Sequence, residues 1–119
     1  MANAIPAQIQ GQRYIDLATT RKNGLVVHTP VWFAESNNKL YVMTNPTSGK
    51  CKRIRNKPQV MVAPCTIRGK ITGPEFPAAA RILPEAEGRP ARELIRAKYW
   101  LARVPFLWSK SNVYLEIAF

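Results

Sequence analysis

A cluster of hydroxyl, amide and cationic side chains surrounds the start of a predicted helix, where a phosphate group can bind. Residues 40–44 alternate as a strand, a Thr-Asn-Pro turn follows, and a helical pattern covers residues 48–56. A helix start offers N–H groups without intrahelical partners and the positive end of the macrodipole. The candidate phosphate ligands are Thr44, Asn45, Ser48 and Lys50, with Arg53 nearby. The pattern favours a phosphorylated ligand, although an N-cap at Ser48 before a solvated basic helix is equally compatible with it.

His28 and Pro30 lie in the second predicted strand, residues 25–34. Proline is uncommon inside a paired strand, so this strand is expected at a sheet edge or beside a ligand. His28 is the only histidine, and no acidic residue or cysteine is patterned near it. We therefore predict no metal site and no visible partner for a general base. Because neither a nucleophilic triad nor a pair of carboxylates on one face is visible, any catalysis would use a reactive group on a cofactor.

Charge and composition describe one small, strongly basic domain. The chain has 119 residues, of which 46% are hydrophobic, with a formal net charge of +11 and a pI near 10.3. This length supports a single domain over residues 1–119 with one core, in which residues 1–12 form an N-terminal arm. Such a basic surface attracts polyanions, which include nucleic acid and acidic cofactors.

The remaining composition predicts a cytoplasmic protein. No apolar run approaches the roughly 18 residues of a membrane span, and the first residues lack the pattern of a secretory signal. Cys51 and Cys65 are the only cysteines, and we expect them to be reduced thiols. Of the tryptophans, Trp32 and Trp100 are expected in the core or at a subunit interface, and Trp108 is free to cover a site.

Period-two patterns and turn residues predict a mainly β fold with two helices. Strands are expected at residues 13–20, 25–34, 40–44, 59–65 and 113–119, with an interrupted strand over 71–83 that contains two prolines. Helices are expected at residues 48–56 and 85–103. The Asn23-Gly24 pair favours a tight hairpin between the first two strands. Six short strands with few helices favour a small antiparallel barrel.

Four segments of the chain, taken in order, resemble the split-barrel flavin and deazaflavin oxidoreductases, the superfamily of pyridoxamine-phosphate oxidase. They are TPVWF (residues 29–33), LYVMTNPTSGK (40–50), KRIRNKPQVMVAPC (52–65) and RGKITGP (68–74). The resemblance covers roughly residues 13–119 and is closest to the small branch that uses the deazaflavin coenzyme F420. It implies a six-stranded antiparallel split β-barrel of the FMN-binding type, and a homodimer with two cofactor sites at the subunit interface.

The same resemblance assigns the cofactor contacts. It places the phosphate at Thr44, Asn45, Ser48 and Lys50, with Arg53 nearby, and the ring along His28, Thr29, Pro30, Val31 and Trp32. Pyridoxamine-phosphate oxidases usually carry arginines where this chain has His28 and Gly49. They also carry a pyridoxal-phosphate binding set near the C-terminus that is not recognisable here. Both departures argue against oxidation of pyridoxamine phosphate by this chain.

The number of cations bears on the choice of cofactor. Flavin mononucleotide (FMN) brings one phosphate, whereas F420 brings a phosphodiester and a poly-glutamate tail. The helix and the basic bend hold more cations than one phosphate requires: Lys50, Lys52, Arg53, Arg55, Lys57, Arg68 and Lys70. We therefore favour an F420-dependent oxidoreductase that transfers hydride to a small unsaturated or planar substrate, with no nucleic-acid or membrane partner. An FMN oxidoreductase, a non-catalytic cofactor-binding protein and a nucleic-acid-binding barrel remain as alternatives.

Overall fold

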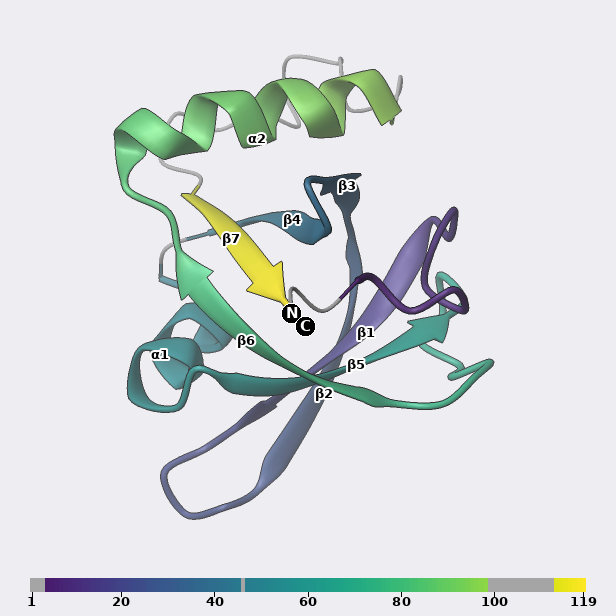
Figure 1. Cartoon of the computed structure of the whole chain (residues 1–119). Helices are drawn as coiled ribbons and strands as arrows, with labels where there is room; N and C mark the ends of the chain where they lie inside the picture. The colour runs from purple at the N-terminus through teal and green to yellow at the C-terminus, as the bar shows by residue number, and fades with distance from the viewer. Residues whose placement is uncertain (1–3, 46, 99–112) are drawn as a thin grey trace.

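The computed structural model describes residues 4–45, 47–98 and 113–119, which form one curled antiparallel sheet with two helices (Figure 1). The strands are β1 (Tyr14–Thr20), β2 (Val26–Trp32), β3 (Ala34–Ser36), β4 (Lys39–Thr44), β5 (Gln59–Cys65), β6 (Phe76–Ile82) and β7 (Val113–Ala118). The helices are α1 (Gly49–Asn56) and α2 (Glu85–Lys98). The mainly β class with two helices is confirmed, but the described chain has seven strands, so the prediction of six is wrong.

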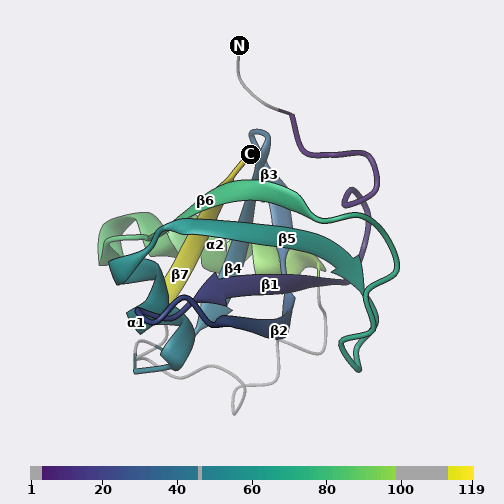
Figure 2. The same ribbon diagram turned by 90° about the horizontal axis from the view of Figure 1, so that it is seen from below.

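The additional strand arises where the predicted second strand divides at Phe33. The strand order in the sheet is β2-β1-β5-β6-β7-β4-β3. Figure 2 shows β6, β5, β1 and β2 in succession on the near side, with β7, β4 and β3 crossing behind them. The two edge strands, β2 and β3, are therefore consecutive in the chain and are joined only by Phe33. The sheet curls into a barrel that is split between these two edge strands, β2 and β3.

Two tight hairpins set the register of the edge strands. The loop between β1 and β2 is Lys22 to Gly24, with a hydrogen bond from Arg21 N–H to the Leu25 carbonyl, and Gly24 has a φ of 88° that a side chain would disfavour. Asn37 and Asn38 both have positive φ, which forms the two-residue turn that matches strand twist. Pro30 lies on the edge strand β2, as expected for a proline in a sheet.

The barrel interior is filled by alternate residues of the strands. Ile15, Leu17, Phe33, Leu40 and Leu115 are each fully buried, because period-two alternation directs one set of side chains inward. β5 is buried on both faces from Val62 to Cys65, as its apolar run predicts. The N-terminal arm also contributes: Ile5 and Ile9 are buried in the same cluster, a contribution that the strand pattern did not predict.

Each helix closes one part of the barrel. α1 buries Cys51 and Ile54 against the interior cluster. α2 lies across β3, β4 and β7 (Figure 1) and buries Ala91 and Ile95 in a second apolar cluster. The predicted extension of this helix to residue 103 lies outside the described residues. Among the residues that the structure describes, no helix is both long and apolar enough to cross a membrane.

Candidate functional site

The curled sheet leaves an open cleft of about 360 Å³ beside the split in the barrel. Four of the residues that the sequence proposed for the cofactor line it, namely Pro30, Val31, Trp32 and Lys50. The other lining residues, which the sequence did not indicate, are Tyr14, Met43, Ile67 and Ile95. The cleft therefore combines an apolar and aromatic wall from β1, β2, β4, α2 and the β5–β6 connection with one cation from α1.

Lys50 provides the positive charge of the cleft. Its side chain is partly buried, and no carboxylate or hydrogen-bond acceptor among the described residues pairs with its ammonium group. Burial lowers the pKa of Lys50, the nearby Cys51 acts in the opposite direction, and the positive charge of Arg53 lowers it further. Desolvating an ammonium group without a counter-charge is unfavourable. An anion in the cleft would remove that cost.

The turn before α1 uses its polar side chains largely for its own structure. Asn45 Oδ1 accepts hydrogen bonds from the Thr47 N–H at 2.9 Å and from the Thr47 hydroxyl at 2.7 Å. Ser48 is the N-cap, and its hydroxyl accepts from the Cys51 N–H at 3.4 Å and lies 3.3 Å from the Thr44 hydroxyl. The capping alternative for Ser48 is thus confirmed. The cofactor-binding roles of Thr44, Asn45 and Ser48 stay predictions.

Arg53 brings a second cation to the start of α1. Its Nε donates to the buried Thr19 hydroxyl at 2.5 Å, and its guanidinium lies so close to Gly49 that a Cβ there would come within 2.5 Å of it. α1 has no acidic residue in its first turn, whereas α2 has Glu85 and Glu87. Helix starts favour negative charge. The first turn of α1 has no carboxylate to balance the positive end of the helix dipole.

His28 lies outside the cleft, and the prediction that it lacks a partner is wrong. Its Nδ1 is 2.6 Å from Oδ2 of Asp16, a short hydrogen bond between neighbouring strands. Glu75, which precedes β6, places a carboxylate oxygen close to both, and the three ligand-type atoms all lie within 4.8 Å of one another. The bond to Asp16 raises the pKa of His28 above 6.5; desolvation opposes this, and the charges of Asp16 and Glu75 add to it.

The hairpin register explains why Asp16 was missed. The three-residue loop places Ala18 opposite His28 and Asp16 opposite Pro30, so Asp16 and His28 are diagonal neighbours on one face. A two-residue Asn-Gly loop would shift the pairing by one and put them on opposite faces. The same register places Tyr14 opposite Trp32 at the cleft, and Thr29 opposite the core residue Leu17. Loop length was the signal that could have identified these pairs.

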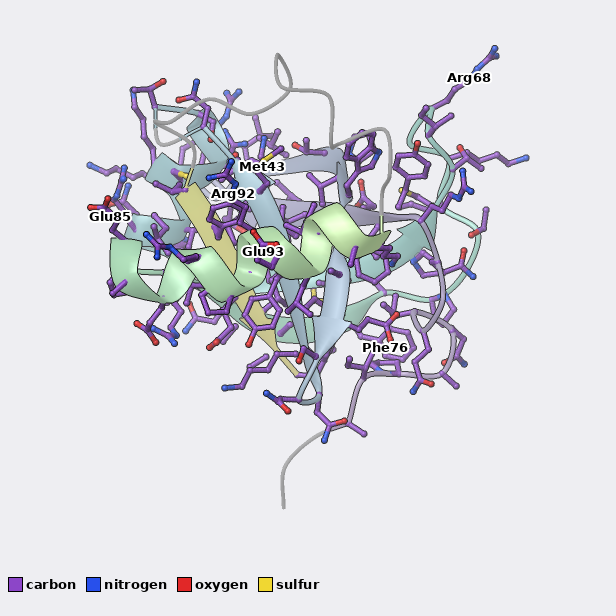
Figure 3. All side chains as sticks on the ribbon, turned by 90° about the horizontal axis from the view of Figure 1, so that it is seen from above. Met43, Arg68, Phe76, Glu85, Arg92 and Glu93 are labelled. Atoms are coloured by element: carbon purple, nitrogen blue, oxygen red, sulfur yellow. The ribbon has the colours of Figure 1, made fainter. Side chains whose placement is uncertain are left out.

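The remaining chemistry-bearing residues have simple environments. Cys51 and Cys65 are free and buried, in agreement with the expected unpaired thiols, and burial raises the pKa of Cys65 to about 11. Trp32 is partly buried against the cluster under α2 and also lines the cleft, and its predicted place at a subunit interface stays a prediction. Trp100 and Trp108 lie outside the described residues. Lys52, Arg55 and Lys57 are exposed on and after α1, and Arg68 projects from the β5–β6 connection away from the body of the molecule (Figure 3).

Solved structures share this fold, although no protein-family model and no curated protein sequence matches the chain. The heme storage protein HutZ from Vibrio cholerae aligns with a TM-score of 0.73 at 11% identity, over 92% of this chain and 82% of that one. A candidate pyridoxamine 5′-phosphate oxidase from Listeria innocua aligns at 0.68 and 18% identity, over 94% and 87%. General Stress Protein 26 from Bacillus anthracis aligns at 0.64 and 24% identity, over 92% and 81%. At these identities the likeness concerns architecture, and the chain has the split-barrel fold of pyridoxamine 5′-phosphate oxidase-like proteins.

Proposed function

We propose that this chain is an oxidoreductase that binds the deazaflavin F420 in the cleft and reduces a small unsaturated or planar substrate. The observation that carries the proposal is Lys50, a partly buried ammonium group in an apolar and aromatic cleft that offers it no anion from the described residues. An anionic, ring-containing ligand satisfies both features. FMN is the alternative ligand, since it shares the combination of ring and phosphate.

The cleft and its surroundings fit the parts of such a ligand. A volume of about 360 Å³ is at the lower end of small-molecule sites and suits a ring system with a short anionic handle. The exposed cations on α1 and on the β5–β6 connection lie outside the cleft and suit a longer anionic tail. The side chains of Lys52, Arg55 and Lys57 are all exposed. These charges are the reason for favouring F420 over FMN.

The residues of this chain would contribute binding, orientation and exclusion of water. Lys50 and the first N–H groups of α1 would hold the phosphate of the cofactor, while Pro30, Val31 and Trp32 would form the wall for its ring. When bound, the cofactor supplies the hydride, so no side chain has to act as a nucleophile. Arg53, fixed by Thr19, would add positive charge behind the phosphate. As in the resemblance, the site is proposed to be shared by two protomers of a homodimer.

Cofactor titration tests this function. Purified protein is titrated with F420 and, separately, with FMN, and ligand fluorescence is followed. We expect Lys50→Ala to weaken binding of the favoured cofactor by roughly ten-fold or more, because a charge-assisted hydrogen bond contributes about 1.5–3 kcal/mol. Lys22→Ala is the control, since it removes the same charge from an exposed position in the β1–β2 loop, which is not among the cations assigned to the ligand.

The outcomes separate the alternatives. The proposal is contradicted if neither F420 nor FMN binds, or if the Lys50→Ala variant binds the cofactor as tightly as the Lys22→Ala control. Binding without turnover of any electron acceptor identifies a cofactor-binding protein without catalysis. DNA affinity that falls steeply with salt, combined with no cofactor binding, identifies the nucleic-acid-binding alternative.

A further inference from the structure

Asp16, His28 and Glu75 come from three separate segments and meet on the outer face of the barrel. Asp16 lies on β1, His28 on β2, and Glu75 in the connection that precedes β6. Asp16 is the only aspartate and His28 the only histidine in a chain with seven acidic residues and a net charge of +11. Two carboxylates and an imidazole thus gather at one point of a molecule that is otherwise rich in cations.

The Asp16 carboxylate lacks a permanent counter-charge. Its side chain is 2% exposed, and His28 is its only hydrogen-bond or ion-pair partner among the described residues. A buried carboxylate needs a charge partner or a metal to offset its lost hydration. An imidazole offsets that loss fully only while it is protonated, and then the second carboxylate, that of Glu75, stays unpaired beside it.

We propose that Asp16, His28 and Glu75 form a binding site for one divalent transition-metal ion of the zinc class. Imidazole nitrogen and carboxylate oxygen are ligands that zinc accepts, and three protein ligands leave one position open to water. Bonds of about 2.0–2.1 Å to a tetrahedral ion put its ligand atoms about 3.4 Å apart. The three atoms here lie within 4.8 Å of one another, so small side-chain movements complete the site.

The burial pattern also suits a metal. Asp16 is fixed in the sheet, whereas the His28 side chain is 49% exposed and Glu75 is exposed, so the ion can enter from solvent and the two outer ligands can close on it. Binding exchanges the proton shared by Asp16 and His28 for the metal. The bound ion would tie the β5–β6 connection to β1 and β2 and would thereby stabilise the fold.

Zinc binding to the untagged protein tests the proposal independently of any cofactor. Protein treated with a chelator and then freed of it is titrated with zinc chloride at about pH 7.5, in competition with a zinc-sensitive dye. We expect one zinc ion per chain and a zinc-dependent rise in melting temperature. His28→Gln and Glu75→Gln should each weaken binding by at least about ten-fold, since even outer-shell substitutions cost that much.

Glu85→Gln is the control, because it removes an exposed carboxylate from the first turn of α2, away from the site. Circular dichroism of each variant verifies the fold, and the exposed position of Glu75 keeps that variant informative if His28→Gln is destabilised. The proposal is overturned if the wild-type chain shows no saturable binding of one zinc ion, or if both ligand variants bind zinc as the control does.

Discussion

Two carboxylates on the outside of the barrel are both nearly buried, but the chain compensates them in different ways. Glu116 on β7 has three partners: Arg81 Nε at 2.9 Å, the Tyr41 hydroxyl at 3.2 Å and Lys39 Nζ at 3.6 Å. Asp16 on β1 has one partner among the residues that the structure describes, the imidazole of His28 at 2.6 Å. The first carboxylate is balanced by Arg81 and Lys39, which stay charged, and the second by an imidazole that can lose its charge near neutral pH.

The difference separates structural charges from functional ones. Arg81 also bonds to Glu87 at 3.1 Å, so the network around Glu116 ties α2 to β6 and β7 and is complete without a ligand. The β1–β2 side instead holds incompletely balanced charges of both signs, namely Asp16 beside His28 and Lys50 in the cleft. Groups that a fold leaves without a matching charge are the places where a metal or an anionic ligand gains the most.

Replacing each of the two carboxylates by its amide tests this difference, and Glu116 should show the greatest loss of stability. Glu116→Gln should lower the free energy of unfolding by about 2 kcal/mol, because it removes charge-assisted hydrogen bonds in a nearly buried position. Asp16→Asn should change it by less than about 1 kcal/mol, because the amide relieves an incompletely compensated buried charge. Urea unfolding of both variants at one pH measures the two free energies. A larger loss for Asp16→Asn would show that Asp16, and not Glu116, is the better compensated carboxylate.

Acid and base should affect the two pairs in opposite directions. Burial alone would raise the pKa of Glu116, but Arg81, Lys39 and Tyr41 together lower it below 4.5. Its contribution to stability is therefore present above that pH and is lost as the pH falls through the lowered pKa. The pKa of His28 is raised above 6.5, so its contribution is complete below that pH and is lost as the pH rises through the raised pKa.

Melting temperatures from about pH 3.5 to about pH 8.5, in the presence of a chelator, check these signs. The difference between wild type and His28→Gln should be larger at about pH 5.5 than at about pH 8.5, while the difference for Glu116→Gln should shrink only in acid. Two curves with the same sign of pH dependence would show that the two carboxylates are compensated alike.

Replacing Lys50 should change the free energy of unfolding least. We expect the replacement to maintain or raise stability while it weakens cofactor binding. Lys50→Met removes a partly buried ammonium group and keeps the length of the side chain, so the free protein should be as stable as wild type or up to about 1 kcal/mol more stable. The same variant should bind the cofactor more weakly. Urea unfolding without ligand, paired with the fluorescence titration, tests both statements. A marked loss of stability would place Lys50 among the structural charges.

Local patterns predicted most of the fold. The alternation in residues 13–20 and 113–119, the apolar run in 59–65 and the prolines in 71–83 all correspond to strands or to the interruption of one. The division of residues 25–34 was not predicted, because Phe33 continues the apolar pattern while the backbone changes partner from β1 to β4. The change of strand partner at Phe33 depends on pairing with strands that are distant in the sequence. The periodicity within residues 25–34 therefore does not predict it.

The cleft was predicted in part, for a similar reason. Pro30, Val31, Trp32 and Lys50 were proposed together and do line one cleft. Ile67 and Ile95 reach it from segments far away in the sequence, and Asp16 meets His28 only through the register of a hairpin. The homodimer and the identity of the cofactor stay predictions, since they depend on molecules that a single chain does not contain. The cytoplasmic location also stays a prediction, since the fold does not determine the compartment.

The burial of Ile5 and Ile9 makes the arm of residues 4–12 part of the barrel, although these residues belong to no strand or helix. Gly11 N–H donates to Glu35 at 2.8 Å, and Lys98 donates to the Gln12 carbonyl at 2.7 Å, so both β3 and the end of α2 hold this arm in place. A shortened protein that begins at Arg13 would retain every strand and yet open the centre of the barrel to water. The smallest autonomous unit of this chain therefore extends beyond its regular secondary structure.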